Sequence, residues 1–254
     1  MQVLPKGIQL SFNFCVKKEM MKRYIPHRIK VRLHLIRRLW SDIQKGHYYD
    51  YAKQVDAETS LKNALQLKQE LKPNEAKMHN LLIAIKRIES IQINPNEIFS
   101  FWNAVGNPNR KNGFVNSRSI VGGVLQDSVG GGLCQLSGLI YYLSLKANLE
   151  ILERHSHSMD IYTAETRFAP LGSDATVAYG YKDLRIRNKL NYPIRFKFSV
   201  LENDIIINLM YTSLIDGNKV EFEEKIIGEN LVEVYTSINN ERVAISKYIK
   251  LLPQ

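Results

Sequence analysis

From residue 151 onward the chain is a series of short strand-like runs separated by turn residues, and this pattern restricts the fold more than any other feature. Pairs of runs flank short polar turns, as β-hairpins do. The expected hairpins join 194–200 to 205–211 and 220–227 to 231–236, and a turn at Asn239-Asn240 leads into 242–252. Successive hairpins predict mostly antiparallel sheet.

The first 150 residues carry helical patterns instead. Residues 56–71 are rich in helix formers, with Leu61, Ala64 and Leu65 on one face. After Pro73, Asn74 is a candidate N-cap for a helix that ends near Ile91. The expected buried face of that helix is Met78, Leu81, Leu82, Ile85 and Ile88.

One further helix is expected from Leu133 to about Ala147. Its predicted buried residues are Leu136, Leu139, Ile140 and Leu143. The predicted fold class is therefore α+β: N-terminal helices, followed by a mostly antiparallel β-sheet packed around one central helix. We expect two parts, a helical arm over 1–50 and an α+β domain over 51–254.

The arm is strongly basic, whereas the rest of the chain is nearly neutral. Residues 1–45 hold 11 Lys and Arg against 2 Asp and Glu, out of 35 and 25 in the whole chain. An apolar stripe also follows one helical face of the arm: Ile29, Leu33, Ile36, Trp40 and Ile43. The stripe either packs on the body, with the basic face in solvent, or lies on anionic lipid or an acidic partner.

Composition and the lack of targeting motifs in the sequence indicate which class of protein to expect. Hydrophobic residues make up 44% and charged residues 24%, as in globular proteins. Cys15 and Cys134 provide no disulfide framework. No apolar run matches a signal peptide or a spanning helix, so we expect a cytoplasmic protein, or a peripheral one at the inner membrane face. The neutral body has no base-reading motif, which argues against nucleic-acid binding.

The strongest local motif is Gly130-Gly131-Gly132-Leu133-Cys134-Gln135, which opens the predicted central helix. Glycines allow a sharp turn and close approach of a ligand to the backbone. A thiol at a helix N-terminus has a lowered pKa, and the free N–H groups there can hold an oxyanion. The motif therefore predicts a cysteine nucleophile, with buried structural cysteine as the alternative. It lacks the Lys and Ser/Thr of a nucleotide-binding P-loop.

The base for such a nucleophile is expected from a short segment downstream, 153–158, which contains His155 and His157. If this segment is a strand, both histidines point to the same face. Asp174 and Asp160 are candidate groups that orient the imidazole. Arg154, the three glycines and Gln135 are expected to contact substrate. A zinc site made by the two histidines and the thiolate is the competing interpretation, but the usual second-ligand spacing is missing, so no metal or other cofactor is predicted.

These residues also resemble a known family. The motifs are Phe99-Ser100-Phe101-Trp102, Gly106, Gly113-Phe114, and GGGLCQLS from Gly130 to Ser137. ERHSHS (153–158), GSDATV (172–177) and DLRIRN (183–188) follow in order. Together they resemble the VanW family over about residues 77–208, which leaves 209–254 as C-terminal hairpins. The family commonly has Gly where Asn96 stands here, and Asn is the next best residue for a left-handed turn.

The resemblance implies a domain of bacterial cell-envelope and glycopeptide-resistance proteins. Some members of the family are linked to cysteine-dependent L,D-transpeptidation of peptidoglycan, which maps the nucleophile to Cys134. The family histidine maps to His157 first and His155 second. Position 174 is not acidic in every short member. We therefore expect an acyltransferase acting on a peptidyl or peptidoglycan-precursor substrate. The alternative is a non-catalytic module that binds a cell-wall peptide or envelope partner and docks through its basic arm.

Overall fold

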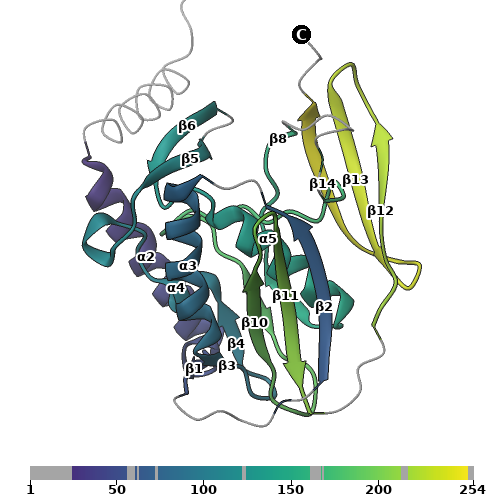
Figure 1. Cartoon of the computed structure of the whole chain (residues 1–254), viewed down its shortest axis with the longest axis horizontal. Helices are drawn as coiled ribbons and strands as arrows, with labels where there is room; N and C mark the ends of the chain where they lie inside the picture. Colours follow the sequence, from purple (N-terminus) through teal and green to yellow (C-terminus); the bar gives the residue numbers. More distant parts are fainter. Residues whose placement is uncertain are drawn as a thin grey trace, which may run out of the picture.

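A computed structural model describes residues 25–55, 61, 63–71, 74–121, 124–160, 167, 169–212 and 217–250 (Figure 1). Cys15 and the first part of the arm lie outside these residues. The helices are α2 (His27–Gln44), α3 (Glu75–Glu89), α4 (Phe101–Val105) and α5 (Leu133–Lys146), with 3-10 turns η1 (His47–Tyr49) and η2 (Arg110–Asn112).

The strands form several small sheets rather than one large one. In chain order they are β1 (Lys53–Gln54), β2 (Asn63–Glu70), β3 (Ile91–Gln92), β4 (Ile98–Ser100), β5 (Asn116–Val121), β6 (Val124–Val129), β7 (Glu150–Glu153), β8 (Met159–Asp160), β9 (Arg185–Arg187), β10 (Arg195–Val200), β11 (Asp204–Tyr211), β12 (Val220–Ile226), β13 (Leu231–Ile238) and β14 (Glu241–Lys250). The sheet orders are β1-β3, β10-β11-β2, β12-β13-β14-β8, β4-β9-β7 and β5-β6. Apart from the parallel pair β8 and β14, the paired strands are antiparallel. The predicted α+β class and C-terminal hairpins are confirmed.

The main core lies between the helices and the small sheets. Helix α5 contacts β2, β7 and β11, while α3 contacts α5 and β10 (Figure 1). All four apolar residues expected on the inner face of α5 are buried. On α3 the prediction is right for Leu81 and Ile88 but wrong for Leu82, which is 50% exposed. A second small core, formed by Leu171, Val232, Val234 and Tyr248, lies under the β12-β13-β14 sheet.

The predicted starts of helices α3 and α5 are confirmed. The side chain of Asn74 caps α3 by accepting a hydrogen bond from the Lys77 N–H at 2.8 Å. Helix α5 begins at Leu133, directly after the glycine run. The turn before β4 also forms as expected, because Asn96 adopts a left-handed φ of 66°.

The helix predicted over 56–71 is wrong for its described part, because β2 occupies Asn63–Glu70. This strand pairs antiparallel with β11, placing Leu65 opposite Leu209 and Leu67 opposite Ile207. Both leucines pack against the main core. Alternate residues of a strand share one face, so the period of two at these leucines outweighs the helix propensity of their neighbours.

Helix α2 docks on the body through polar contacts rather than through its apolar stripe. Arg38 pairs with Glu153 at 2.5 Å, and Asp42 pairs with Arg185 at 2.6 Å. The rings of His34 and Tyr181 are in contact, with centroids 4.4 Å apart. The stripe lies on the opposite side of the helix and is exposed: Ile29 48%, Leu33 45%, Ile36 52%, Trp40 63% and Ile43 49%. The interpretation in which the stripe packs on the body is therefore wrong.

Candidate active site

The glycine run forms a tight turn between β6 and α5 that only glycine fits. Gly130 and Gly132 have φ values of 82° and 97°. A Cβ atom on Gly130 would lie 2.8 Å from Cβ of Pro108, and one on Gly132 would lie 2.7 Å from Cγ of Lys77. Both the backbone conformation and the close neighbours therefore exclude side chains here.

A buried asparagine on α3, which the sequence analysis missed, holds this turn in place. The Nδ2 group of Asn80 donates to the carbonyl oxygens of Val115 at 3.0 Å and Gly131 at 3.2 Å. Its Oδ1 accepts from the Val115 N–H at 2.9 Å. Asn80 is fully buried, so these bonds satisfy its amide where water cannot reach it.

Cys134 is the second residue of α5 and is partly exposed. Its thiol donates to the Val177 carbonyl oxygen at 3.8 Å, and the His157 side chain lies close enough to the thiol to act on its pKa. Burial by itself would raise the pKa of the Cys134 thiol, but the hydrogen bond and charge of His157 outweigh it and lower the pKa below its usual value. The thiol is thus shifted toward the thiolate form.

His157 lies between the thiol and a carboxylate. Its Nδ1 is 2.6 Å from Oδ2 of Asp174, and its backbone N–H donates to the same oxygen at 2.7 Å. Nδ1 is occupied in this way, which leaves Nε2 available for a second interaction. Burial alone would lower the pKa of His157, but its hydrogen bonds to Asp174 and Cys134 raise it to about 9.

Asp174 is itself fixed by two further side chains. Its Oδ1 accepts from Nη2 of Arg154 at 2.9 Å and from the hydroxyl of Tyr248 at 2.5 Å. Burial opposes ionisation of this carboxyl, yet the hydrogen bond from His157 and the charge of Arg154 hold its pKa at about 2. Tyr248 comes from β14, more than seventy residues away in the sequence, and no local pattern indicated it.

Arg154 lies behind the site rather than in it. Its side chain is 8% exposed, and its guanidinium donates to Asp174, to the Gly172 carbonyl oxygen and to the Ser246 hydroxyl. Its charged group also lies 4.8 Å from the ring centroid of Tyr141. The guanidinium is occupied by these contacts within the protein, and through them it positions Asp174.

The structure separates the two histidines. Residues 154–157 are not in a strand, so the condition under which both side chains would share one face is not met. Whereas the ring of His157 binds Asp174 and acts on the pKa of Cys134, His155 binds Glu153 with its Nε2 3.0 Å from Oε1. The strand β7 ends at Glu153, so the alternation of side chains along a strand does not apply to His155 and His157.

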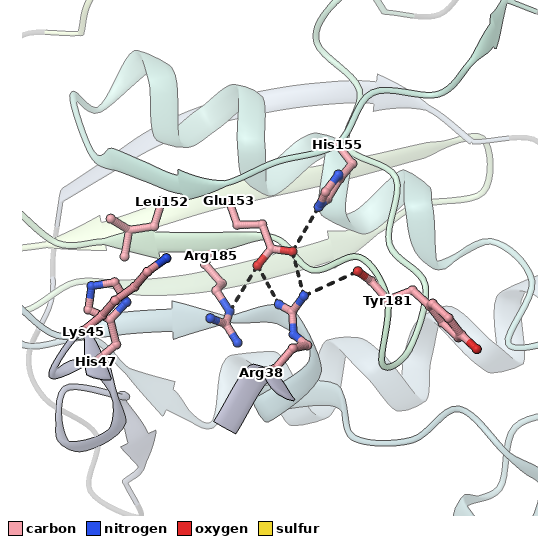
Figure 2. Close-up of a pocket in the computed structure, with 8 residues that line it drawn as sticks. All are labelled: Arg38, Lys45, His47, Leu152, Glu153, His155, Tyr181 and Arg185. Atoms are coloured by element: carbon pink, nitrogen blue, oxygen red, sulfur yellow. Dashed lines mark hydrogen bonds and ion pairs between the residues drawn. The ribbon is translucent and has the colours of Figure 1, made fainter. Parts of the chain in front are cut away.

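His155 instead lines a separate pocket with a volume of about 310 Å³ (Figure 2). The other lining residues are Arg38, Lys45, His47, Leu152, Glu153, Tyr181 and Arg185. Figure 2 shows Glu153 at its centre, bound by Arg38, Arg185 and His155. Burial opposes ionisation of Glu153, but the bonds from His155 and Arg38 lower its pKa to about 2. Cys134 does not line this pocket.

The backbone donors near the thiol differ from those expected. Gly130 donates to the Val115 carbonyl oxygen at 3.1 Å and Gly131 to that of Ser128 at 3.3 Å, so both N–H groups are used in the turn. Among the described residues, the N–H groups of Gly132 and Cys134 have no such acceptor. The Gln135 side chain donates to the Glu70 carbonyl oxygen at 3.1 Å. Two of the three expected glycine donors are therefore engaged elsewhere.

Asp160, the other candidate for orienting an imidazole, pairs with Arg167. Within the described ranges, no group of three or more His, Cys, Asp or Glu side chains could hold a metal ion. Likewise, no described helix is long and apolar enough to cross a membrane.

The geometry defines a class of site: a cysteine at a helix N-terminus, paired with a histidine that a partly buried aspartate orients. Residues 76–210, more than half of the chain, match the family model described as VanW like protein. The chain therefore belongs to the VanW-like family, as the motifs predicted. No solved structure matches the chain.

The chain is also similar to two known proteins. The chain is 35% identical over 144 residues to YoaR of Bacillus subtilis, an uncharacterized protein, a match that covers 57% of this chain and 46% of YoaR. It is 32% identical over 114 residues to the vancomycin B-type resistance protein VanW of Enterococcus faecalis, covering 45% and 42%. The name of the second relative links that protein to vancomycin resistance. The matches span less than half the length of each relative.

Proposed function

We propose that the chain is a cysteine-dependent acyltransferase that acts on a peptidyl or peptidoglycan-precursor substrate. The observation that carries this proposal is the Cys134–His157–Asp174 arrangement, in which Asp174 binds Nδ1 of His157 and His157 lowers the pKa of the Cys134 thiol. The name of the resistance relative directs the choice of substrate toward the cell wall.

The reaction follows from these positions. The Cys134 thiolate attacks the carbonyl carbon of the donor, forming a C–S bond, and the negative charge moves to the carbonyl oxygen. We assign the binding of that oxygen to the N–H groups of Gly132 and Cys134, which have no backbone acceptor among the described residues. When the C–N bond breaks, His157 gives its proton to the departing amine. An acceptor amine then attacks the thioester, His157 takes the proton, and the thiolate leaves.

The experiment is acid quenching of the protein mixed with a stem peptide, followed by intact-mass measurement. Wild type and Cys15→Ser should both gain the mass of the acyl group, whereas Cys134→Ala should not. Cys134→Ala should melt within a few degrees of wild type. A large loss of stability would instead assign Cys134 to the core. Peptide binding without any mass increase, unaffected by alkylation of Cys134, would support the alternative, a non-catalytic binding module.

We also propose that α2 docks the protein on an anionic membrane surface. At 100° per residue, Arg28 and Arg32 border the exposed stripe on one side, and Lys30 and Arg37 border it on the other. An apolar face that contains tryptophan and has cationic borders fits anionic headgroups above an acyl layer. The opposite face of α2, held by Arg38 and Asp42, remains attached to the body.

Vesicle flotation tests this docking. The full chain should float with vesicles that contain phosphatidylglycerol and not with pure phosphatidylcholine, and flotation should fall at about 1 M salt. Trp40→Asp should abolish flotation, while Ile226→Asp, a matched change at a residue 75% exposed on β12, should not. If Trp40→Asp altered the oligomeric state and left flotation unchanged, the stripe would be a protein interface and the proposal would be wrong.

A further inference from the structure

Lys77, on the first turn of α3, lies against the turn that carries the thiol. A Cβ atom built on Gly132 would lie 2.7 Å from Cγ of Lys77, 3.3 Å from Cε and 3.5 Å from Cδ. The aliphatic part of Lys77 therefore crosses Gly132, the N-cap of α5. Cys134 follows two residues later, so the Lys77 side chain lies beside the N-terminal turn of α5 as far as Cε, the carbon that carries the ammonium group.

This ammonium group has no anionic partner among the described residues. No ion pair or side-chain hydrogen bond involves Lys77, in contrast to Arg38, Arg154 and Arg185, each of which is paired with a carboxylate. Lys77 is also partly buried, and this burial lowers the pKa of its amine. A partly desolvated charge without a partner is unfavourable for folding, and such groups concentrate at functional sites.

We propose that Lys77 is the anion-binding residue of this site and that the acyl donor carries a carboxylate close to the reacting carbonyl. The proposal rests on the acyltransferase function given above. A lysine ammonium is a compact point charge that binds a carboxylate without requiring a fixed plane. Its position at a helix N-terminus adds to the attraction, because the N-terminal dipole of α5 has the same sign.

Two alkylating probes separate carboxylate binding from thiol reactivity. Iodoacetamide is neutral and reports the reactivity of Cys134, whereas iodoacetate carries a carboxylate next to the reacting carbon. The ratio of the iodoacetate rate to the iodoacetamide rate at Cys134 is measured in the full chain. Peptide mass spectrometry identifies Cys134 as the alkylated residue and separates it from Cys15.

Lys77→Met keeps the aliphatic stem over Gly132 and removes the charge. We expect it to lower the ratio of the two rates about tenfold, as the loss of one partly screened charge contact should. The iodoacetamide rate should stay within about twofold, and Lys77→Arg should restore most of the ratio. Lys86→Met, at an exposed position of the same helix, is the matched control and should leave the ratio unchanged.

The outcomes distinguish this inference from the proposed function. An unchanged ratio in Lys77→Met, or an equal fall in both rates, would overturn the role of Lys77 while leaving the nucleophile intact. A wild-type Cys134 that reacts no faster with iodoacetamide than an ordinary thiol would overturn the proposed function and this inference with it. The melting temperature of Lys77→Met should equal or exceed that of wild type, because an unpaired charge is removed.

Discussion

Replacing Asp174 by Asn should destabilise the protein and leave His157 without its partner. The carboxylate accepts bonds from the His157 backbone and ring, from Arg154 and from Tyr248. An amide of the same shape keeps one acceptor oxygen but has no charge. The guanidinium of Arg154, 8% exposed, then remains buried without its counter-charge.

The magnitude follows from the pKa of Asp174, which is about 2 in the folded chain against 3.8 for a free side chain. This difference corresponds to about 2.5 kcal/mol of folding free energy. Because the folded pKa is lowered, the contribution is complete above pH 3.8 and is lost as the pH falls through 2. With the buried guanidinium added, Asp174→Asn should lose about 3–4 kcal/mol at pH 7.

Urea unfolding, followed by circular dichroism at pH 7, measures this loss. Asp127→Asn, at an exposed position on β6, is the matched control and should change the free energy of unfolding by less than about 0.5 kcal/mol. Below pH 3.8 the difference between wild type and Asp174→Asn should shrink. A loss below 1 kcal/mol at pH 7 would refute the reasoning that Asp174 is held ionised by these contacts.

Two further predictions test the histidine and the glycine turn. His157→Gln should raise the pH midpoint of Cys134 alkylation to the free-thiol value of about 8.5 or above it, because the cation that lowers the pKa is removed while the burial that raises it remains. His155→Gln should leave that midpoint unchanged. Gly132→Ala should cost about 2–3 kcal/mol in urea unfolding, from its left-handed φ and its overlap with Lys77. Gly46→Ala, with a φ of 73° in open space, should cost about 1 kcal/mol, and equal losses at the two glycines would contradict the packing argument.

The sequence predicted those parts of the fold whose signals are local. Asn74 caps α3, the glycine run opens α5, and the polar turns close the hairpins, because each of these depends on residues within a few positions. The helix prediction was wrong for residues 63–70 because their alternating leucines lie among strong helix formers. Pairing with β11, about 140 residues away, decides the outcome.

For α2 the sequence predicted an amphipathic helix but not the face that docks. The apolar pattern marks one side, yet the helix is held by Arg38 and Asp42 on the other side. Their partners, Glu153 and Arg185, are more than a hundred residues away. Ion pairs between distant residues leave no periodic trace, so the exposed stripe could be identified only from the structure.

The sequence predicted the reactive residues of the candidate site and Asp174, which contacts His157, but not the other residues that support them. The sequence predicted Cys134 and His157 because a thiol after a glycine turn at a helix start, with a histidine nearby, is typical of a cysteine nucleophile and its base. Asn80, Lys77 and Tyr248 were missed, since each reaches the site from another element. Arg154 was expected to contact substrate, but the structure places it behind Asp174.

The most direct test of the account is the rate of Cys134 alkylation by iodoacetamide between pH 5 and pH 10, in a chain with Cys15→Ser. The lowered pKa of the thiol predicts a midpoint well below about 8.5, the value of an ordinary cysteine. The bond to His157 is the physical cause of that shift. A midpoint at or above 8.5 would contradict the account, because Cys134 would then be an ordinary buried thiol.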